Sequence, residues 1–146
     1  MAGWIAGGLA VLAWAVALTV QDLRHRRLPD LLTVPAVPVV WAVVLVTGHG
    51  WAVLGGVSWF LMCVLPGRLS DRLRAGGGDA KLALSLGAVA AATGGVVGLL
   101  WTVAVASVVT LLFALIPGVR NDSVPHGPGM LAATAVVTGV INGGQW

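Results

Sequence analysis

The feature that most constrains the fold is an almost wholly apolar stretch, residues 80–116, interrupted only by Thr93-Gly94-Gly95. One straight helix of that length would reach roughly 55 Å at 1.5 Å per residue. The hydrocarbon core of a bilayer is only about 30 Å thick. We therefore expect two membrane-spanning helices here, over residues 80–92 and 96–116.

The rest of the composition agrees with a membrane protein. Hydrophobic residues make up 58% of the chain and charged residues 9%, and the mean hydropathy is +0.98. These values lie far outside the range of soluble domains. With 146 residues, the chain has room for one compact bundle and no second domain. The expected fold is all-α: a polytopic membrane helix bundle forming a single integral-membrane domain over residues 1–146.

Six apolar runs divide the chain. Pro29 is expected to start the second run, Gly48-His49-Gly50 to form the turn after it, and Pro66-Gly67 to end the third. Two further prolines, Pro35 and Pro38, should bend the second run near its start. The runs cover residues 4–20, 31–46, 51–65, 80–92, 96–116 and 129–141. Six spans are expected, with five as the alternative because the fourth and sixth runs are short.

The positive charges predict the orientation of these spans. The connections after the first, third and fifth runs carry three, three and one arginines, and the other connections carry none. Basic connections stay in the cytoplasm, so both termini are expected outside. The first run ends at Asp22 and the fourth begins at Asp79, so both carboxylates should lie at the cytoplasmic face.

Asp22 and Asp79 are candidates for chemistry because an ionisable group at membrane depth costs about 2.5–3.5 kcal/mol. Two carboxylates that share a site can hold one proton between them, as in an aspartyl dyad. A structural role stays open for each. The alternative for Asp79 is a role as a helix cap only. The alternative for Asp22 is pairing with nearby arginines, although an acid at a helix C-terminus opposes the macrodipole.

Asp79 belongs to the motif Gly76-Gly77-Gly78-Asp79-Ala80-Lys81. Glycines permit a sharp bend and the close approach of another chain, both of which an extended substrate would need. Lys81 is either an anchor at the membrane interface or a charge that steadies the dyad or the loop.

The remaining polar residues give weaker signals. Asp30, Asp71 and Asp122 are expected to be solvated partners of nearby arginines, and the lone Cys63 a small buried hydrophobe. The three histidines, at positions 25, 49 and 126, show no metal-ligand spacing, so no metal is expected. The seven tryptophans are interpreted as interface anchors, and nothing indicates nucleic-acid binding.

Three segments together resemble the type IV prepilin peptidases, a family of membrane aspartic peptidases with a G-x-G-D motif. The first is Asp22 with the basic stretch and Leu28-Pro29-Asp30 that follow it, and the second is the motif from Gly76 to Lys81. The third is Pro125-His126-Gly127-Pro128-Gly129. The family commonly has Asn at the position of Asp30 and a bulky apolar residue at that of His126.

The resemblance implies an activity and its site. The two aspartates at the positions of Asp22 and Asp79 would be catalytic, supported by Gly76, Gly77, Gly78 and Lys81. Residues expected on the substrate side are Pro29, Asp30, Pro125, Gly127 and Pro128. The substrate would be a pilin or pseudopilin precursor of a type IV pilus or secretion system, with a basic leader that ends in Gly before an apolar helix. Leader cleavage would occur at the cytoplasmic face of a bacterial inner membrane, without a cofactor.

Two expectations delimit this activity. The chain is expected not to methylate the product, because the paired cysteines of the bifunctional relatives are absent and no S-adenosylmethionine fold can form. Two other functions stay open: a small cation or proton transporter or channel subunit that uses both aspartates, and a non-catalytic assembly factor. Cleavage of a leader peptide distinguishes the peptidase from both.

Overall fold

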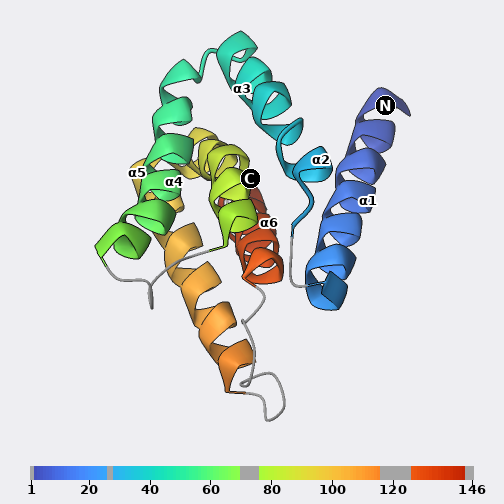
Figure 1. The fold of residues 1–146 in the computed structure, drawn as a ribbon. Helices are drawn as coiled ribbons and strands as arrows, with labels where there is room; N and C mark the ends of the chain where they lie inside the picture. The colour runs from blue at the N-terminus through green and yellow to red at the C-terminus, as the bar shows by residue number, and fades with distance from the viewer. Residues whose placement is uncertain (1, 26–27, 70–75, 116–125, 144–146) are drawn as a thin grey trace.

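The computed structural model describes residues 2–25, 28–69, 76–115 and 126–143, and these residues are almost entirely helical (Figure 1). The elements are α1 (Ala2–His25), α2 (Asp30–Thr33), α3 (Ala36–Val46), the short 3₁₀ helix η1 (Gly50–Ala52), α4 (Val53–Leu69), α5 (Gly77–Ala114) and α6 (Gly127–Gly143). No strand occurs in the described ranges. The all-α prediction is therefore confirmed for them.

Helix α5 has the predicted interruption. Gly95 has φ 62° and ψ −157°, which is not a helical conformation. This φ is in the left-handed region, where glycine meets no steric penalty. Figure 1 shows the second half of α5 turning back past the first half. A Cβ on Gly98 would lie 3.1 Å from the carbonyl oxygen of Ala90, so the two halves are close just beyond the turn.

Within the described residues, two helices are long and apolar enough to cross a membrane, Gly50–Arg68 and Gly77–Ala114. The segment Asp30–Val46 is apolar but shorter. The number of six spans and the outward position of the termini remain predictions.

The proline predictions have mixed outcomes. Pro29 immediately precedes α2, as expected, and Pro35 separates α2 from α3. The prediction that Pro66 ends the third run is wrong, because α4 continues through it to Leu69. The last apolar run was predicted from residue 129, whereas α6 already begins at Gly127. Proline and glycine are tolerated in the first turn of a helix, where the backbone N–H groups have no partner within the helix.

Helices α4 and α5 are in backbone contact through glycine. A Cβ on Gly56 would lie 2.1 Å from the carbonyl oxygen of Leu84, and one on Gly87 would lie 2.6 Å from that of Gly55. Small residues allow helices in membranes to approach this closely. The first half of α5 is thereby held at a fixed position against α4.

Three tryptophans have roles inside the bundle instead of the expected anchoring at the interface. The Trp14 indole donates a hydrogen bond to Leu32 O at 2.9 Å, which ties α1 to α2. The Trp41 indole donates a hydrogen bond to Leu84 O at 3.2 Å, which ties α3 to α5. Trp59 is buried in the core with side chains of α1, α5 and α6.

Candidate active site

Asp22 lies near the C-terminal end of α1 and is only 4% exposed. Its Oδ2 accepts a hydrogen bond of 3.1 Å from the backbone N–H of Gly127, the first residue of α6. The N-terminus of a helix carries a partial positive charge and N–H groups without partners in the helix. Asp22 is thus unfavourably placed on its own helix but favourably placed at the start of another.

Asp79 is the third residue of α5 and is partly buried. Its carboxylate lies beside Gly76, the residue that precedes the helix, because a Cβ on Gly76 would lie 3.0 Å from Asp79 Oδ2. The first N–H groups of a helix have no partner within it. The capping role considered for Asp79 stays a prediction, and it does not conflict with a second role.

The two aspartates are 57 residues apart in the chain (79 − 22). Each carboxyl group lies at the N-terminus of a different helix, Asp22 at α6 and Asp79 at α5. These two helix starts share a neighbour, because Leu28 contacts both Gly127, which donates to Asp22, and Gly78, the residue before Asp79. The pairing of the two carboxylates in one dyad stays a prediction, which this shared neighbour supports.

Leu28 fills the space between these two helix ends and is 7% exposed. A Cβ on Gly78 would lie 2.6 Å from the Leu28 Cβ, and one on Gly127 would lie 3.2 Å from its Cδ1. Leu28 thus sets the spacing between the start of α5 and the start of α6. The sequence reasoning used Leu28 only as part of the resemblance, because a single apolar residue in a basic connection carries no signal of its own.

The three glycines of the motif are not equivalent. Among the described glycines only Gly48 and Gly95 have positive φ, so the sharp bend expected at residues 76–78 does not occur there. A Cβ on Gly77 would meet nothing within 4 Å, whereas one on Gly78 would strike Leu28. Close approach is therefore required at Gly78, and the chain that approaches is the protein's own.

Lys81 forms an ion pair with Asp30, with 2.6 Å between Nζ and Oδ1. Asp30 was expected to pair with nearby arginines; its partner among the described residues lies 51 positions further along the chain. The side chains of Lys81 and Asp30 are 38% and 66% exposed, so the pair contributes little stability. It ties α5 to the segment that carries Leu28, which agrees with the loop-steadying role considered for Lys81.

The third segment of the resemblance contributes to the site through α6. Gly127 and Pro128 are buried at the start of this helix, and Pro29 is partly buried before α2. Pro125 lies outside the described residues, as do Asp71 and Asp122. His126, not predicted as a site residue, has its Nδ1 2.5 Å from Oγ1 of Thr110 in α5.

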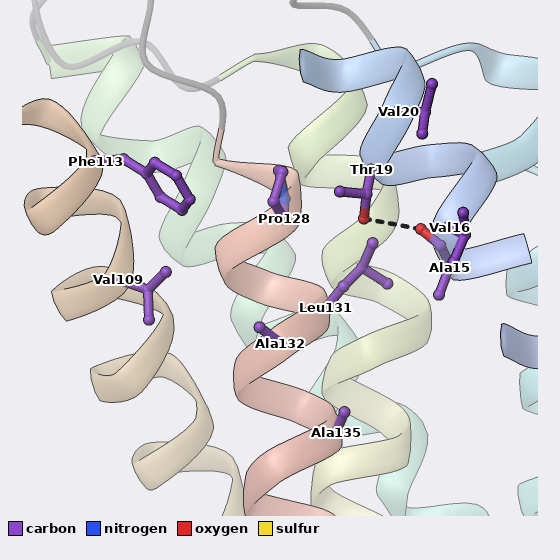
Figure 2. A pocket seen from close by; sticks show the side chains of 10 residues that line it. All are labelled: Ala15, Val16, Thr19, Val20, Val109, Phe113, Pro128, Leu131, Ala132 and Ala135. Carbon is purple, nitrogen blue, oxygen red and sulfur yellow. Dashed lines mark hydrogen bonds between the residues drawn. The ribbon is translucent and has the colours of Figure 1, made fainter. Parts of the chain in front are cut away.

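An apolar cleft of about 530 Å³ is bounded by α1, the second half of α5 and α6 (Figure 2). The lining residues are Ala15, Val16, Thr19, Val20, Val109, Phe113, Pro128, Leu131, Ala132 and Ala135. Thr19 is one helical turn from Asp22, and its hydroxyl donates to Ala15 O at 2.9 Å. Pro128 directly follows Gly127, so the cleft ends next to the carboxylate.

Within the described ranges, no group of three or more His, Cys, Asp or Glu side chains could hold a metal ion. Cys63 of α4 is partly buried and packs against the core cluster that includes Leu28 and Leu82. Two adjacent carboxyl groups can hold a water molecule and one proton between them. This arrangement can perform general acid–base chemistry without a metal.

The sequence profile of the type IV leader peptidase family matches residues 9–115, which include Asp22 and Asp79. Comparison with curated proteins gave no match, and neither did comparison with solved structures. The matched residues are well over half of the chain, and the apolar helices indicate a membrane protein. The chain belongs to the type IV leader peptidase family.

Proposed function

We propose that this protein is a membrane-embedded aspartic endopeptidase that removes the basic leader from pilin or pseudopilin precursors. The observation that carries the proposal is that Asp22 and Asp79 lie at the starts of two helices, α6 and α5, that share Leu28 as a neighbour. The residues that match the leader peptidase family include both aspartates.

The proposed chemistry is hydrolysis without a covalent intermediate. One carboxylate takes a proton from a water molecule while the other, protonated, donates a hydrogen bond to the scissile carbonyl. The proton then passes to the leaving amine, and the dyad returns to its singly protonated form. The Gly127 N–H at 3.1 Å orients Asp22, and Gly76 lies beside Asp79. Two fixed carboxyl groups avoid reorganisation during the reaction.

The cleft supports a substrate whose scissile bond adjoins an apolar segment. Its lining is apolar apart from Thr19, whose hydroxyl is bonded within its own helix. An apolar segment lying there would have its end beside Asp22, because Thr19 and Pro128 bound the cleft on that side. A basic leader beyond this point would be in the aqueous phase. This division matches a precursor in which a charged leader precedes a membrane helix.

The direct test is leader cleavage in detergent by purified variants. Asp22→Asn and Asp79→Asn keep the shape of each side chain, and each should slow cleavage by about 10²–10⁴-fold because a general acid or base is lost. The control is Asn142→Ala, which changes an exposed polar residue near the end of α6 and leaves both dyad positions intact. Cleavage by either dyad variant at the wild-type rate would contradict the proposal. A wild-type protein that leaves every precursor intact would point to the transporter or assembly functions instead.

We also propose that the dyad faces the cytoplasm of a bacterial inner membrane. In a Cys63→Ala background, a cysteine at Arg24 should react only with reagents that reach the cytoplasm. A cysteine at Gly48 should react only with external reagents. Both positions are exposed in the structure. Labelling of the two positions from the same side would contradict the orientation.

A further inference from the structure

We propose that His126 and Thr110 are positioning residues for the dyad: their side-chain contact fixes the start of α6 so that the Gly127 N–H points at Asp22. The kinetic part of this inference rests on the proposed peptidase function. The structural part does not, because it concerns the position of one backbone amide.

The contact joins the two side chains directly. Thr110 Oγ1 lies 2.9 Å from the Ala106 carbonyl oxygen of its own helix and 2.5 Å from His126 Nδ1. A hydroxyl has a single proton to donate and can also accept. When that proton goes to Ala106, a protonated His126 Nδ1 donates to Thr110; in the other tautomer the Thr110 hydroxyl donates to Nδ1. Burial lowers the pKa of the His126 imidazole, which favours the neutral ring, and either neutral tautomer keeps the contact.

His126 is attached directly to the group that it positions. It immediately precedes Gly127, and its carbonyl oxygen accepts the Met130 N–H at 3.1 Å, a bond of the first turn of α6. A turn anchored at His126 therefore carries the Gly127 N–H with it. That N–H reaches Asp22 Oδ2 at 3.1 Å, across 105 residues of sequence.

The first turn of α6 has a second contact with the same threonine. A Cβ on Gly129 would lie 3.0 Å from Thr110 Oγ1 and 3.2 Å from the Ala106 carbonyl oxygen. Gly129 thus permits the close approach of α6 to α5. Among the described contacts, the His126 side chain supplies the only hydrogen bond between the first turn of α6 and α5. The Thr110 hydroxyl is the point on α5 from which the position of Gly127 is set.

The test is a double-mutant cycle on the full-length protein. Thr110→Val and His126→Leu each leave one polar group of the pair buried without its partner, which is costly, whereas replacing both partners by apolar groups can be nearly neutral. Each single variant should lower kcat about tenfold with KM unchanged. The double variant should be about as slow as either single variant, because all three lack the same contact, and it should unfold at a higher temperature than the single variants because no buried polar group is left without its partner. Thr110→Ser keeps the hydroxyl and should retain wild-type kcat.

The matched control is Thr93→Val. Thr93 also donates to carbonyl oxygens of its own helix, those of Val89 and Ala90, but it contacts no side chain of α6 through its hydroxyl. Its replacement should leave kcat unchanged. Single variants with wild-type kcat, or a double variant as slow as the product of the two single losses, would overturn the proposal.

A second readout is independent of cleavage. In detergent-solubilised protein labelled at glycine, NMR should show faster exchange of the Gly127 amide with solvent in each single variant and in the double variant, and wild-type exchange in Thr93→Val. Unchanged exchange in both single variants would overturn the inference even if the peptidase assay were positive. If the wild-type protein cleaved no precursor but exchange followed the expected pattern, the peptidase proposal would fail and the positioning inference would stand.

Discussion

The two carboxylates of the site have similar surroundings that arise in different ways. Asp79 lies at the N-terminus of its own helix, beside Gly76, three residues away. Asp22 lies at the wrong end of its own helix and meets an N-terminus only through Gly127 of α6, 105 residues away. The position of Asp79 is a local property of the chain, whereas that of Asp22 depends on the packing of α1, α5 and α6. Disturbances of packing should therefore affect Asp22 more than Asp79.

The largest effect is expected from comparing Gly127→Ala with Gly76→Ala. The new Cβ would lie 2.8 Å from Asp22 Oδ2 in the first variant and 3.0 Å from Asp79 Oδ2 in the second. Gly127 is buried against Leu28, whereas Gly76 is exposed, so only the second site can adjust. We expect Gly127→Ala to lower kcat about a hundredfold, since misplacement by about 1 Å has that cost. Gly76→Ala should retain most activity.

Gly139→Ala is the control for the Gly127 variant, because a Cβ at this position of the same helix meets nothing within 4 Å. It should cleave precursor at the wild-type rate. A larger loss in Gly76→Ala than in Gly127→Ala would show that the local site is the more fragile one and reverse the comparison.

The next effect concerns the spacing between the two helix starts. Gly78→Ala forces a Cβ to within 2.6 Å of the Leu28 Cβ. Overpacking of this kind costs about 1–3 kcal/mol, so the variant should unfold at lower temperature and lose activity. Gly77→Ala should do neither, because its Cβ meets nothing within 4 Å. The unfolding temperatures of both variants can be measured in detergent. Equal unfolding temperatures would contradict the inference that Leu28 sets the spacing between the two helix starts.

A smaller effect is expected from filling the cleft. Ala132→Phe places a ring among the lining residues, whereas Val136→Phe lies on the same helix outside the lining. Burial of one large apolar side chain contributes about 1.5–3 kcal/mol, and the ring in the cleft would prevent one substrate side chain from being buried there. We therefore expect Ala132→Phe to raise KM for the full precursor at least tenfold, with Val136→Phe near wild type.

A short peptide that contains the leader and the scissile bond but lacks the apolar segment separates the cleft from the dyad. Ala132→Phe should cleave this peptide as fast as wild type does. If the filled cleft slowed both substrates equally, the dyad itself would be disturbed and the cleft would have no role in binding.

The smallest effect is expected from the ion pair of Lys81 and Asp30. Both side chains are more than a third exposed, and such pairs contribute about 0–1 kcal/mol. Lys81→Met should lower the unfolding temperature only slightly, and the difference from wild type should shrink as salt is added. A loss of activity as large as that of Asp79→Asn would instead assign Lys81 to the dyad.

Much of the architecture could be predicted from the sequence because it depends on local chemistry. The apolar runs predict helices, and Thr93-Gly94-Gly95 predicts the break that the structure has at Gly95, whose φ of 62° suits glycine. The start of a helix near Asp79 follows from the glycine motif before it. The end of α4 was wrongly predicted at Pro66, because packing against α5 outweighs the one hydrogen bond that a proline removes.

What the sequence by itself determined is the set of helices, their apolar character and the placement of Asp79 at a helix start. Tertiary structure alone decided that Asp22 meets Gly127, that Leu28 separates Gly78 from Gly127, and that His126 reaches Thr110. The physical reason is that these helices are apolar nearly all round, so no polar face shows which sides meet. Partners more than a hundred residues apart become visible only when the helices have packed.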